Sequence, residues 1–260
     1  MPIRSAIVNA TNLQRSLDFY TEFLDARIVG KPTASRAVLD FLSGTVELRA
    51  VDGATASTWI PDDLQKGFRH IGFKVDQIDP RAEALKAADV PFHLDPLDAT
   101  GGVRICFFYD PDGTLLEFVA GDLQYAAVHD PEGVRAERAL GVPERPRFDH
   151  IAVTVHDQVA TAAFYAALDF SLIGTLEQPQ DPRGFSIGYL KSGNTVLEVF
   201  TYDSAKQERR PQLDAPGFRC VQLAGVVPDG AQPSTTDGTQ QLLVDPNGLV
   251  FAVSGERSSL

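Results

Sequence analysis

The sequence predicts an α+β fold made of four βαβββ units, of which the fourth is degenerate and lacks its helix. Two observations support this prediction. The strand-like stretch GFRHIGFKV at 67–75 is paralleled by GFRCVQLAGV at 217–226. The stretch FFYDPDGTLLEFV at 107–119 is paralleled by LLVDPNGLVFAV at 242–253. Such self-similarity indicates that one supersecondary unit recurs along the chain.

The first half of the chain contains two of these units, at about 3–52 and 67–120. In the first, a strand is followed by the segment 12–25, whose apolar residues recur at helical spacing. Two strand-like segments separated by a Ser-Gly turn come next. In the second, the helix-like segment 79–90 lies between the two strands quoted above. Residues 1–120 are therefore predicted to form one domain.

The second half repeats the pattern at about 148–203 and 217–255. The third unit again has a strand followed by a helix-like segment that contains a Phe-Tyr pair. The fourth has PDGAQPSTTDGTQ where the others have a helix, and this composition does not form one. Residues 148–260 are predicted to form a second domain. The stretch 121–147 is predicted to be a linker with one helical turn, because it is rich in charge, Pro and Gly.

Composition narrows the classes of function. The apolar fraction of 43% and the charged fraction of 22% are those of a globular protein. A net charge of −12 argues against nucleic acid or an anionic membrane as partner. No apolar run approaches the length of a membrane span, and the N-terminus has no signal-peptide pattern, so a cytoplasmic location is expected. Cys106 and Cys220 are too few for a disulfide framework.

Aligning the four units with one another identifies candidate metal ligands. Units two and three each have a His in the first strand and a Glu in the last, and the His-to-Glu spacing differs by one residue between them. Units one and four have lost this combination. In chain order the first-strand position is Ser5, His70, His150 and Cys220, and the last-strand position is Glu47, Glu117, Glu198 and Ala252. Imidazole and carboxylate groups on neighbouring strands can hold a divalent metal.

Four βαβββ units, a strand-start His and the DPxG turns at 110–113 and 245–248 resemble the vicinal oxygen chelate superfamily. This superfamily includes glyoxalase I, extradiol dioxygenases, and fosfomycin and bleomycin resistance proteins. The resemblance implies two glyoxalase-like domains in fused form, in which two units face each other around a metal cleft. It leaves the pairing of units open. Pairing within each half gives two incomplete ligand sets, whereas crossed pairing of units two and three gives two His and two Glu in one cleft. We favour the crossed pairing.

The resemblance implies one divalent metal ion (Zn, Ni, Co, Mn or Fe) held by His70, Glu117, His150 and Glu198. It also implies a metal-dependent lyase or isomerase that moves a proton next to a carbonyl of a small α-hydroxycarbonyl substrate. Glu117 is the first choice of base and Glu198 the second. The expected protein is a monomer or homodimer. A non-catalytic small-molecule binder or antibiotic-resistance protein is the alternative, and an extradiol-type dioxygenase is less favoured because Cys220 and Ala252 replace its ligands.

Several other side chains are predicted to shape the substrate pocket. Two arginines flank the metal unit, and four aromatic residues lie on strands that could line the cleft. These residues are Arg69, Arg104, Phe107, Tyr109, Tyr189 and Phe200. Roles as core aromatics or surface ion-pair partners are equally compatible with the sequence. Three further histidines, His93, His129 and His156, have no counterpart in other units and are read as surface residues. Glu47 is read as a relic or as the partner of Arg49 or another cation.

Overall fold

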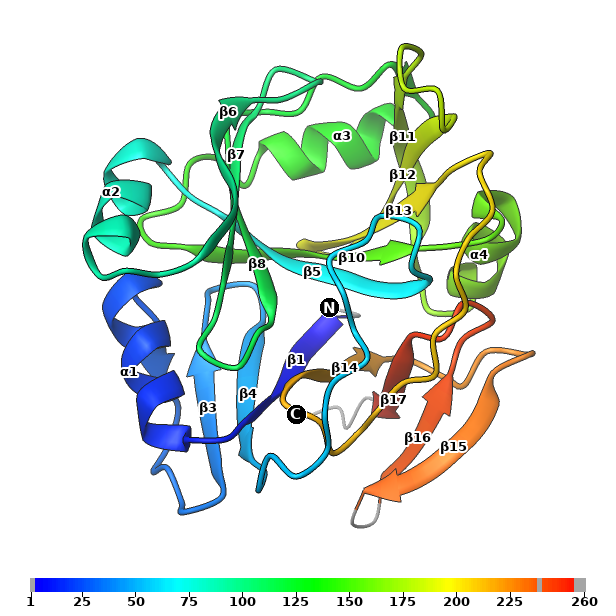
Figure 1. The fold of residues 1–260 in the computed structure, drawn as a ribbon. Coiled ribbons are helices and arrows are strands. Elements are labelled where there is room, and N and C mark those ends of the chain that lie inside the picture. The colour runs from blue at the N-terminus through cyan, green and yellow to red at the C-terminus, as the bar shows by residue number, and fades with distance from the viewer. Residues whose placement is uncertain (1–2, 238–239, 255–260) are drawn as a thin grey trace, which may run out of the picture.

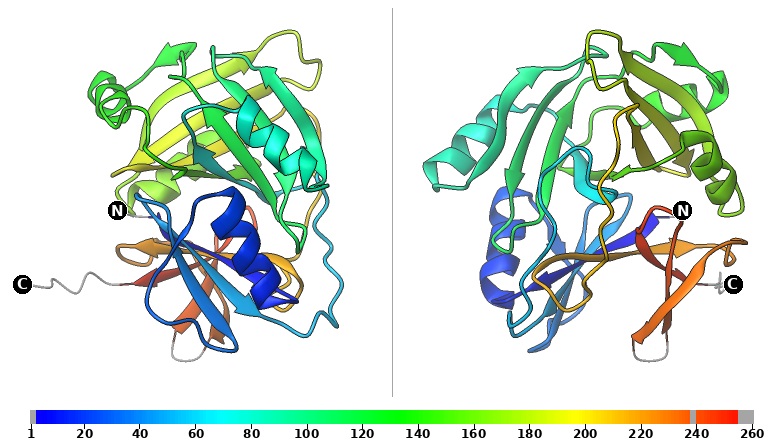
Figure 2. Two further views of the ribbon diagram at one scale, coloured as in Figure 1. Left: turned by 90° about the vertical axis from the view of Figure 1, so that its left-hand side faces the viewer. Right: turned by 45° about the vertical axis from the view of Figure 1, so that its right-hand side comes forward.

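The computed structural model describes residues 3–237 and 240–254. Its strands form two mixed sheets, one of nine and one of eight strands. The sheets form two layers that Figure 1 shows one above the other. The two further views in Figure 2 show the same two layers from other sides. The predicted α+β fold of repeated units is confirmed.

The nine-stranded sheet is built by units two and three, with one short strand from the stretch between them. Its order is β6-β7-β8-β5-β10-β13-β12-β11-β9. Unit two comprises β5 (Gly67–Lys74), α2 (Asp79–Ala87), β6 (Phe92–Asp98), β7 (Arg104–Tyr109) and β8 (Leu115–Ala120). Unit three comprises β10 (Arg147–Thr154), α4 (Gln158–Ala166), β11 (Ser171–Gln178), β12 (Phe185–Ser192) and β13 (Thr195–Thr201).

The eight-stranded sheet is built by units one and four, in the order β15-β16-β17-β14-β1-β4-β3-β2. The described residues of the segment predicted to lack a helix, 228–237 and 240, contain none, and 232–237 form β15 instead. Unit one comprises β1 (Ile3–Ala10), α1 (Leu13–Phe23), β2 (Arg27–Ile28), β3 (Arg36–Asp40) and β4 (Thr45–Ala50). Unit four comprises β14 (Gly217–Ala224), β15 (Gln232–Asp237), β16 (Gln240–Val244) and β17 (Val250–Ser254).

The pairing of the units is crossed. In each sheet the first strands of two units pair antiparallel, β5 with β10 and β1 with β14. In every unit the last strand runs parallel to the first. Each sheet thus contains one unit from each half of the chain. This agrees with the pairing favoured from the ligand pattern, and it brings units two and three together.

Side chains alternate between the two faces of the central strands. Ile71 and Phe73 of β5 and Ile151 of β10 belong to the large core, which also contains Val8 and Val221 of the other sheet. The core therefore lies between the two sheets. His70 and His150 directly precede the core residues Ile71 and Ile151. Their side chains therefore lie on the opposite, concave face of the nine-stranded sheet.

The helices link units within each half. The hydroxyl of Tyr20 in α1 donates to Asp110 in the first DPxG turn at 2.9 Å, and Tyr165 in α4 donates to Asp245 in the second at 2.9 Å. Each of these aspartates also accepts two backbone N–H groups of its own turn. Gly113, with φ of 86°, supplies the left-handed conformation that the first turn needs. The helices therefore connect units that are neighbours in the same half of the chain, whereas each sheet joins units from different halves.

The stretch predicted as a linker, 121–147, contains two regular elements. The short strand β9 (Ala127–Val128) pairs with β11 at the edge of the nine-stranded sheet. The helix α3 (Pro131–Arg138) begins after Asp130, whose carboxylate accepts the N–H of Glu132 at 3.0 Å. Figure 1 shows α3 lying across the concave side of this sheet.

The predicted division into domains at 1–120 and 148–260 remains a prediction about boundaries. Residues 1–2, 238–239 and 255–260, which those ranges include, lie outside the described residues, and so does the predicted end of unit four at 255. Among the helices of the described residues, none is long and apolar enough to cross a membrane.

Candidate metal centre

A β-bulge precedes each histidine in the two central strands. The pairing of β5 with β10 shifts register between Phe148 and His150, and this leaves Asp149 as an extra residue. A second shift leaves Arg69 as the extra residue directly before His70. Arg69, His70 and Asp149 all line one cavity. The bulges thus place two consecutive side chains of each strand on the concave face.

Glu117, Gly72 and His150 form one row across strands β8, β5 and β10. Gly72 is needed between the other two because the imidazole of His150 lies over it. A Cβ at this position would lie 2.0 Å from Cε1 and 2.2 Å from Nε2 of His150. The glycine therefore lets the His150 ring reach across β5 to Glu117, with Nε2 2.9 Å from Oε2.

His70, Ala152 and Glu198 form the matching row across β5, β10 and β13. Here the intervening residue is Ala, and the Nε2 of His70 is 3.9 Å from Oε2 of Glu198. The two rows occupy equivalent positions in units two and three. The distance between His and Glu is shorter in the row that contains glycine.

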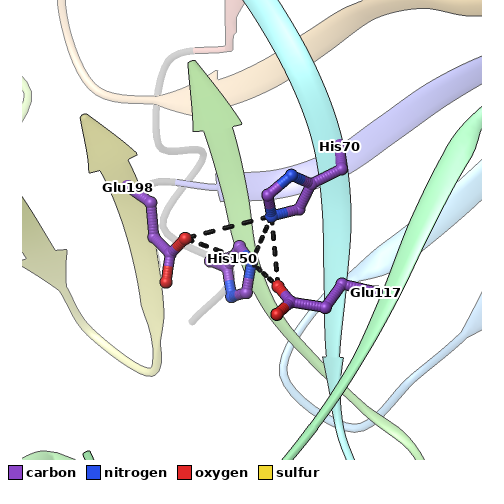
Figure 3. Close-up of side chains that lie close together, drawn as sticks. All are labelled: His70, Glu117, His150 and Glu198. Carbon is purple, nitrogen blue, oxygen red and sulfur yellow. Dashed lines mark hydrogen bonds and ion pairs between the residues drawn. The ribbon is translucent and has the colours of Figure 1, made fainter. Parts of the chain in front are cut away.

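The four side chains converge on one point (Figure 3). Their ligand atoms all lie within 4.8 Å of one another. The Nε2 atoms of His70 and His150 are 3.1 Å apart. Oε2 of Glu117 is 3.1 Å from Nε2 of His70, and Oε2 of Glu198 is 3.6 Å from Nε2 of His150. This group has the donor types and the mutual closeness of a divalent-metal site.

Only one of the two imidazoles has a partner on its other nitrogen. Nδ1 of His150 is 3.1 Å from the carboxylate of Asp149. Nδ1 of His70 is buried and makes no hydrogen bond among the described residues. A carboxylate behind a histidine keeps its proton on Nδ1 and its lone pair on Nε2, which is the arrangement that a metal ligand needs.

Burial and mutual charge shift every pKa of the cluster. Burial lowers the pKa of His70 to about 4, although the neighbouring carboxylate of Glu117 acts to raise it. Burial also acts to lower the pKa of His150, but Glu198, Asp149 and Glu117 together raise it above its usual value. Burial would raise the pKa of Glu117, yet its bonds to both imidazoles hold it at about 2. Burial raises the pKa of Glu198 to about 8. The cluster therefore holds carboxylates of very different basicity.

A cavity of about 890 Å³, counting its open mouth, lies over the cluster. Its walls come from both units and from the connecting stretch, which supplies Leu123 and the Glu137 of α3. The carboxylate of Glu137 accepts the hydroxyl of Tyr125 at 2.6 Å. The segment between the two halves is therefore part of the wall of the site.

Residues 3–118 match the family model of the Glyoxalase/Bleomycin resistance protein/Dioxygenase superfamily. The first half of the chain is therefore similar to that superfamily. The resemblance inferred from the repeated units is confirmed.

Solved structures with the same fold include glyoxalase I of one organism and a protein described as a putative dioxygenase. Glyoxalase I from Zea mays superposes with a TM-score of 0.66 at 19% identity, covering 97% of this chain and 91% of that one. Its V278E mutant gives 0.67 at 18% identity, covering 97% and 91%. A putative dioxygenase from Bacillus subtilis gives 0.61 at 13% identity, covering 99% and 86%. At these identities the likeness establishes the fold alone, and it does so over both halves of the chain.

The cavity contains four of the six side chains that were predicted to shape a substrate pocket: Arg69, Phe107, Tyr189 and Phe200. Arg104 and Tyr109 lie outside it. Arg104 is bound on the surface by Asp79 and Asp98, at 2.6 and 3.0 Å. Tyr109 contacts Nδ1 of His93 at 3.2 Å.

Three residues of the site were not identified from sequence. Asp149 and Gly72 act through the His150 ring, and Glu137 enters from the supposed linker. A comparison of units two and three could have drawn attention to Asp149. The residue before the candidate ligand His is Arg in unit two and Asp in unit three.

The equivalent positions of units one and four do not form a ligand set. Oε2 of Glu47 binds Arg36 at 2.6 Å and its Oε1 binds Arg49 at 2.6 Å, as an ion-paired relic would. Cys220 is buried in an apolar cluster with Ala252, and burial raises the pKa of its thiol to about 11. Within the described part of the chain, the repeated ligand positions thus come together as a metal-type cluster in units two and three.

Proposed function

We propose that the protein is a metal-dependent lyase or isomerase of glyoxalase type that acts on a small α-hydroxycarbonyl compound. The observation that carries this proposal is the convergence of His70, Glu117, His150 and Glu198, all but His150 of which line one cavity. A divalent ion held by these residues supplies Lewis-acid polarisation of a carbonyl beside an acidic C–H bond. Zn, Ni, Co, Mn and Fe all suit this donor set.

The two carboxylates differ in how tightly they are held. Oε2 of Glu117 lies 2.9 and 3.1 Å from the two imidazoles, whereas Oε2 of Glu198 lies 3.6 and 3.9 Å away. We therefore assign Glu198 as the base that takes the proton from carbon and returns it to a neighbouring carbon or the opposite face. This reverses the preference for Glu117 that the family resemblance gave. No electron is gained or lost by the substrate in this transfer.

The walls of the cavity support such a role. Both imidazoles are buried, and aromatic side chains stand on the His70 side of the cluster. Asp149 holds the His150 ring in one orientation. An extradiol-type reaction receives no such support, because its ligands would come from units three and four, which lie in different sheets. Cytoplasmic location and a monomeric or homodimeric state remain predictions.

Deuterium exchange tests this function without knowledge of the product. Protein loaded in turn with Zn, Ni, Co, Mn and Fe(II) is incubated in D₂O with a panel of α-hydroxyketones. We expect exchange at the carbon beside the carbonyl, followed by NMR. Glu198→Gln should lose exchange while keeping metal, and Glu117→Gln should lose metal. Protein that binds none of these metals would refute the proposal. Metal binding without exchange would instead leave small-molecule binding, including resistance by sequestration, as the function.

A further inference from the structure

Three phenylalanines of the cavity stand on the His70 side of the metal cluster. The ring centroid of Phe107 is 4.8 Å from that of His70, and that of Phe200 is 6.1 Å from it. Phe185 lies 5.8 Å from Phe200. Phe107 and Phe185 are both only half-buried, so each keeps part of its surface toward the cavity. An apolar shelf, defined as Phe107, Phe185 and Phe200, thus borders the His70 side of the centre.

The cations of the cavity are already bound by the protein. The guanidinium of Arg69 donates to the Asp63 carboxylate at 2.6 Å and to the Asp63 carbonyl at 3.1 Å, and it lies 4.3 Å from the centroid of the Phe200 ring. The ammonium of Lys74 donates to the carbonyl of Gly121. A ligand carboxylate would compete with these bonds for the same N–H groups, although Nε of Arg69 has no hydrogen-bond partner among the described residues.

Carboxylates outnumber cations in the lining. Besides the two metal ligands, Asp149 and Glu137 face the cavity, against Arg69 and Lys74. A divalent ion would bring the sum of these charges close to zero. A ligand with several carboxylates, such as a glutathione conjugate, would therefore bring charge that the described walls do not neutralise.

From these features we infer the class of substrate, an inference that rests on the function proposed above. The substrate carries no net charge and joins two neighbouring oxygens to a bulky apolar group, preferably an aromatic ring. The oxygens face the four ligands, and the ring packs on the apolar shelf, where edge or offset contacts with Phe107 and Phe185 are available. Peptide thiol conjugates are outside this class.

Two hydroxamates with the same chelating head test this inference. Benzohydroxamate carries a phenyl ring and acetohydroxamate a methyl group. With Zn-loaded protein, titration calorimetry should give at least 10-fold tighter binding of benzohydroxamate. Phe107→Ala should reduce this ratio to about 2-fold or less. Tyr109→Ala is the matched control, because Tyr109 is on the same strand but outside the cavity, and it should keep the ratio.

Phe185→Ala, on the opposite unit, serves if the Phe107 variant does not fold. Equal affinities for the two hydroxamates in the Zn-loaded protein would overturn the substrate class and leave the metal-dependent function standing. S-benzylglutathione that binds as tightly as benzohydroxamate would also overturn it. Protein that takes up no metal would overturn the proposed function itself, and the substrate class with it.

Discussion

The carboxylate of Asp149 lies 3.1 Å from Nδ1 of His150, its neighbour in the chain. A β-bulge makes this contact possible because it turns both side chains to the same face of the strand. The matching bulge in β5 presents Arg69 beside His70, whose Nδ1 has no hydrogen bond among the described residues. Of the two imidazoles, therefore, the described part of the protein holds only that of His150 in place through its Nδ1 atom.

Asp149→Asn should weaken metal binding by about 10- to 100-fold, as loss of a carboxylate behind a ligand histidine does elsewhere. The amide no longer carries the charge that keeps the proton on Nδ1 of His150. Competition with a fluorescent zinc chelator measures the change. Glu132→Gln, an exposed change on α3, is the control and should have no effect. Unchanged affinity in the Asp149→Asn variant would show that His150 needs no support.

Gly72→Ala should displace His150 and strongly reduce metal binding. The added Cβ would lie 2.0 Å from Cε1 of that ring, far inside contact distance, so the ring must leave its place. Ala152→Gly is the matched control at the repeat-related position and should keep the metal at a cost of roughly 1 kcal/mol in stability. The d–d absorption of Co²⁺-loaded protein reports both changes. A normal cobalt spectrum in Gly72→Ala would contradict the row geometry.

His70→Ala and His150→Ala should each abolish metal binding, whereas Ser5→Ala and Cys220→Ala should not. The first pair are within the cluster, while Cys220 is buried among apolar side chains in the other sheet. Metal content of the four purified proteins, by mass spectrometry, checks this. Loss of metal from the Cys220 variant, with retention in the His150 variant, would be incompatible with a site shared by units two and three.

Asp110 should make stability fall as pH rises from about 4 to 6. Burial raises the pKa of its carboxyl from 3.8 to about 6, despite the N–H groups of the turn that favour its charge. Since the folded protein holds this proton more tightly than the unfolded chain, the carboxyl stabilises the fold fully below pH 4. That contribution, of order 3 kcal/mol, is lost as the pH passes 6.

Asp110→Asn removes this titration and keeps a partner for Tyr20. The difference in unfolding free energy between variant and parent, from urea denaturation at pH 4 to 7, should therefore grow in favour of the variant with pH. A difference that is constant over this range would mean that Asp110 is already charged in acid.

Repetition made much of the fold predictable. Because the units align with one another, His70 and His150 could be recognised as equivalent positions, and the survival of both glutamates favoured crossed pairing before any strand register was known. The DPxG and Phe-Tyr motifs were visible as well, but their meeting at Tyr20 and Asp110 was not, since that contact depends on how a helix of one unit packs on a turn of the next.

The rest depended on register and on long-range pairing. Asp149 reaches the site through a bulge, which the strand pattern of one chain does not reveal. Phe107 and Tyr109 are two residues apart on the same strand and have the same predicted orientation. Phe107 lines the cavity and Tyr109 does not, because the cavity ends between them. Charge and Pro content predicted a linker at 121–147, but an edge strand and a helix of that stretch attach to unit three.

The crossing of the sheets has a consequence for the integrity of the molecule. Each half of the chain contributes one histidine and one glutamate to the same point, so neither half alone could retain the ion. A bound metal would cross-link the two halves of the chain where β5 pairs with β10. Chelation would then remove one of the links between the two halves, which the paired strands and the shared core also hold together.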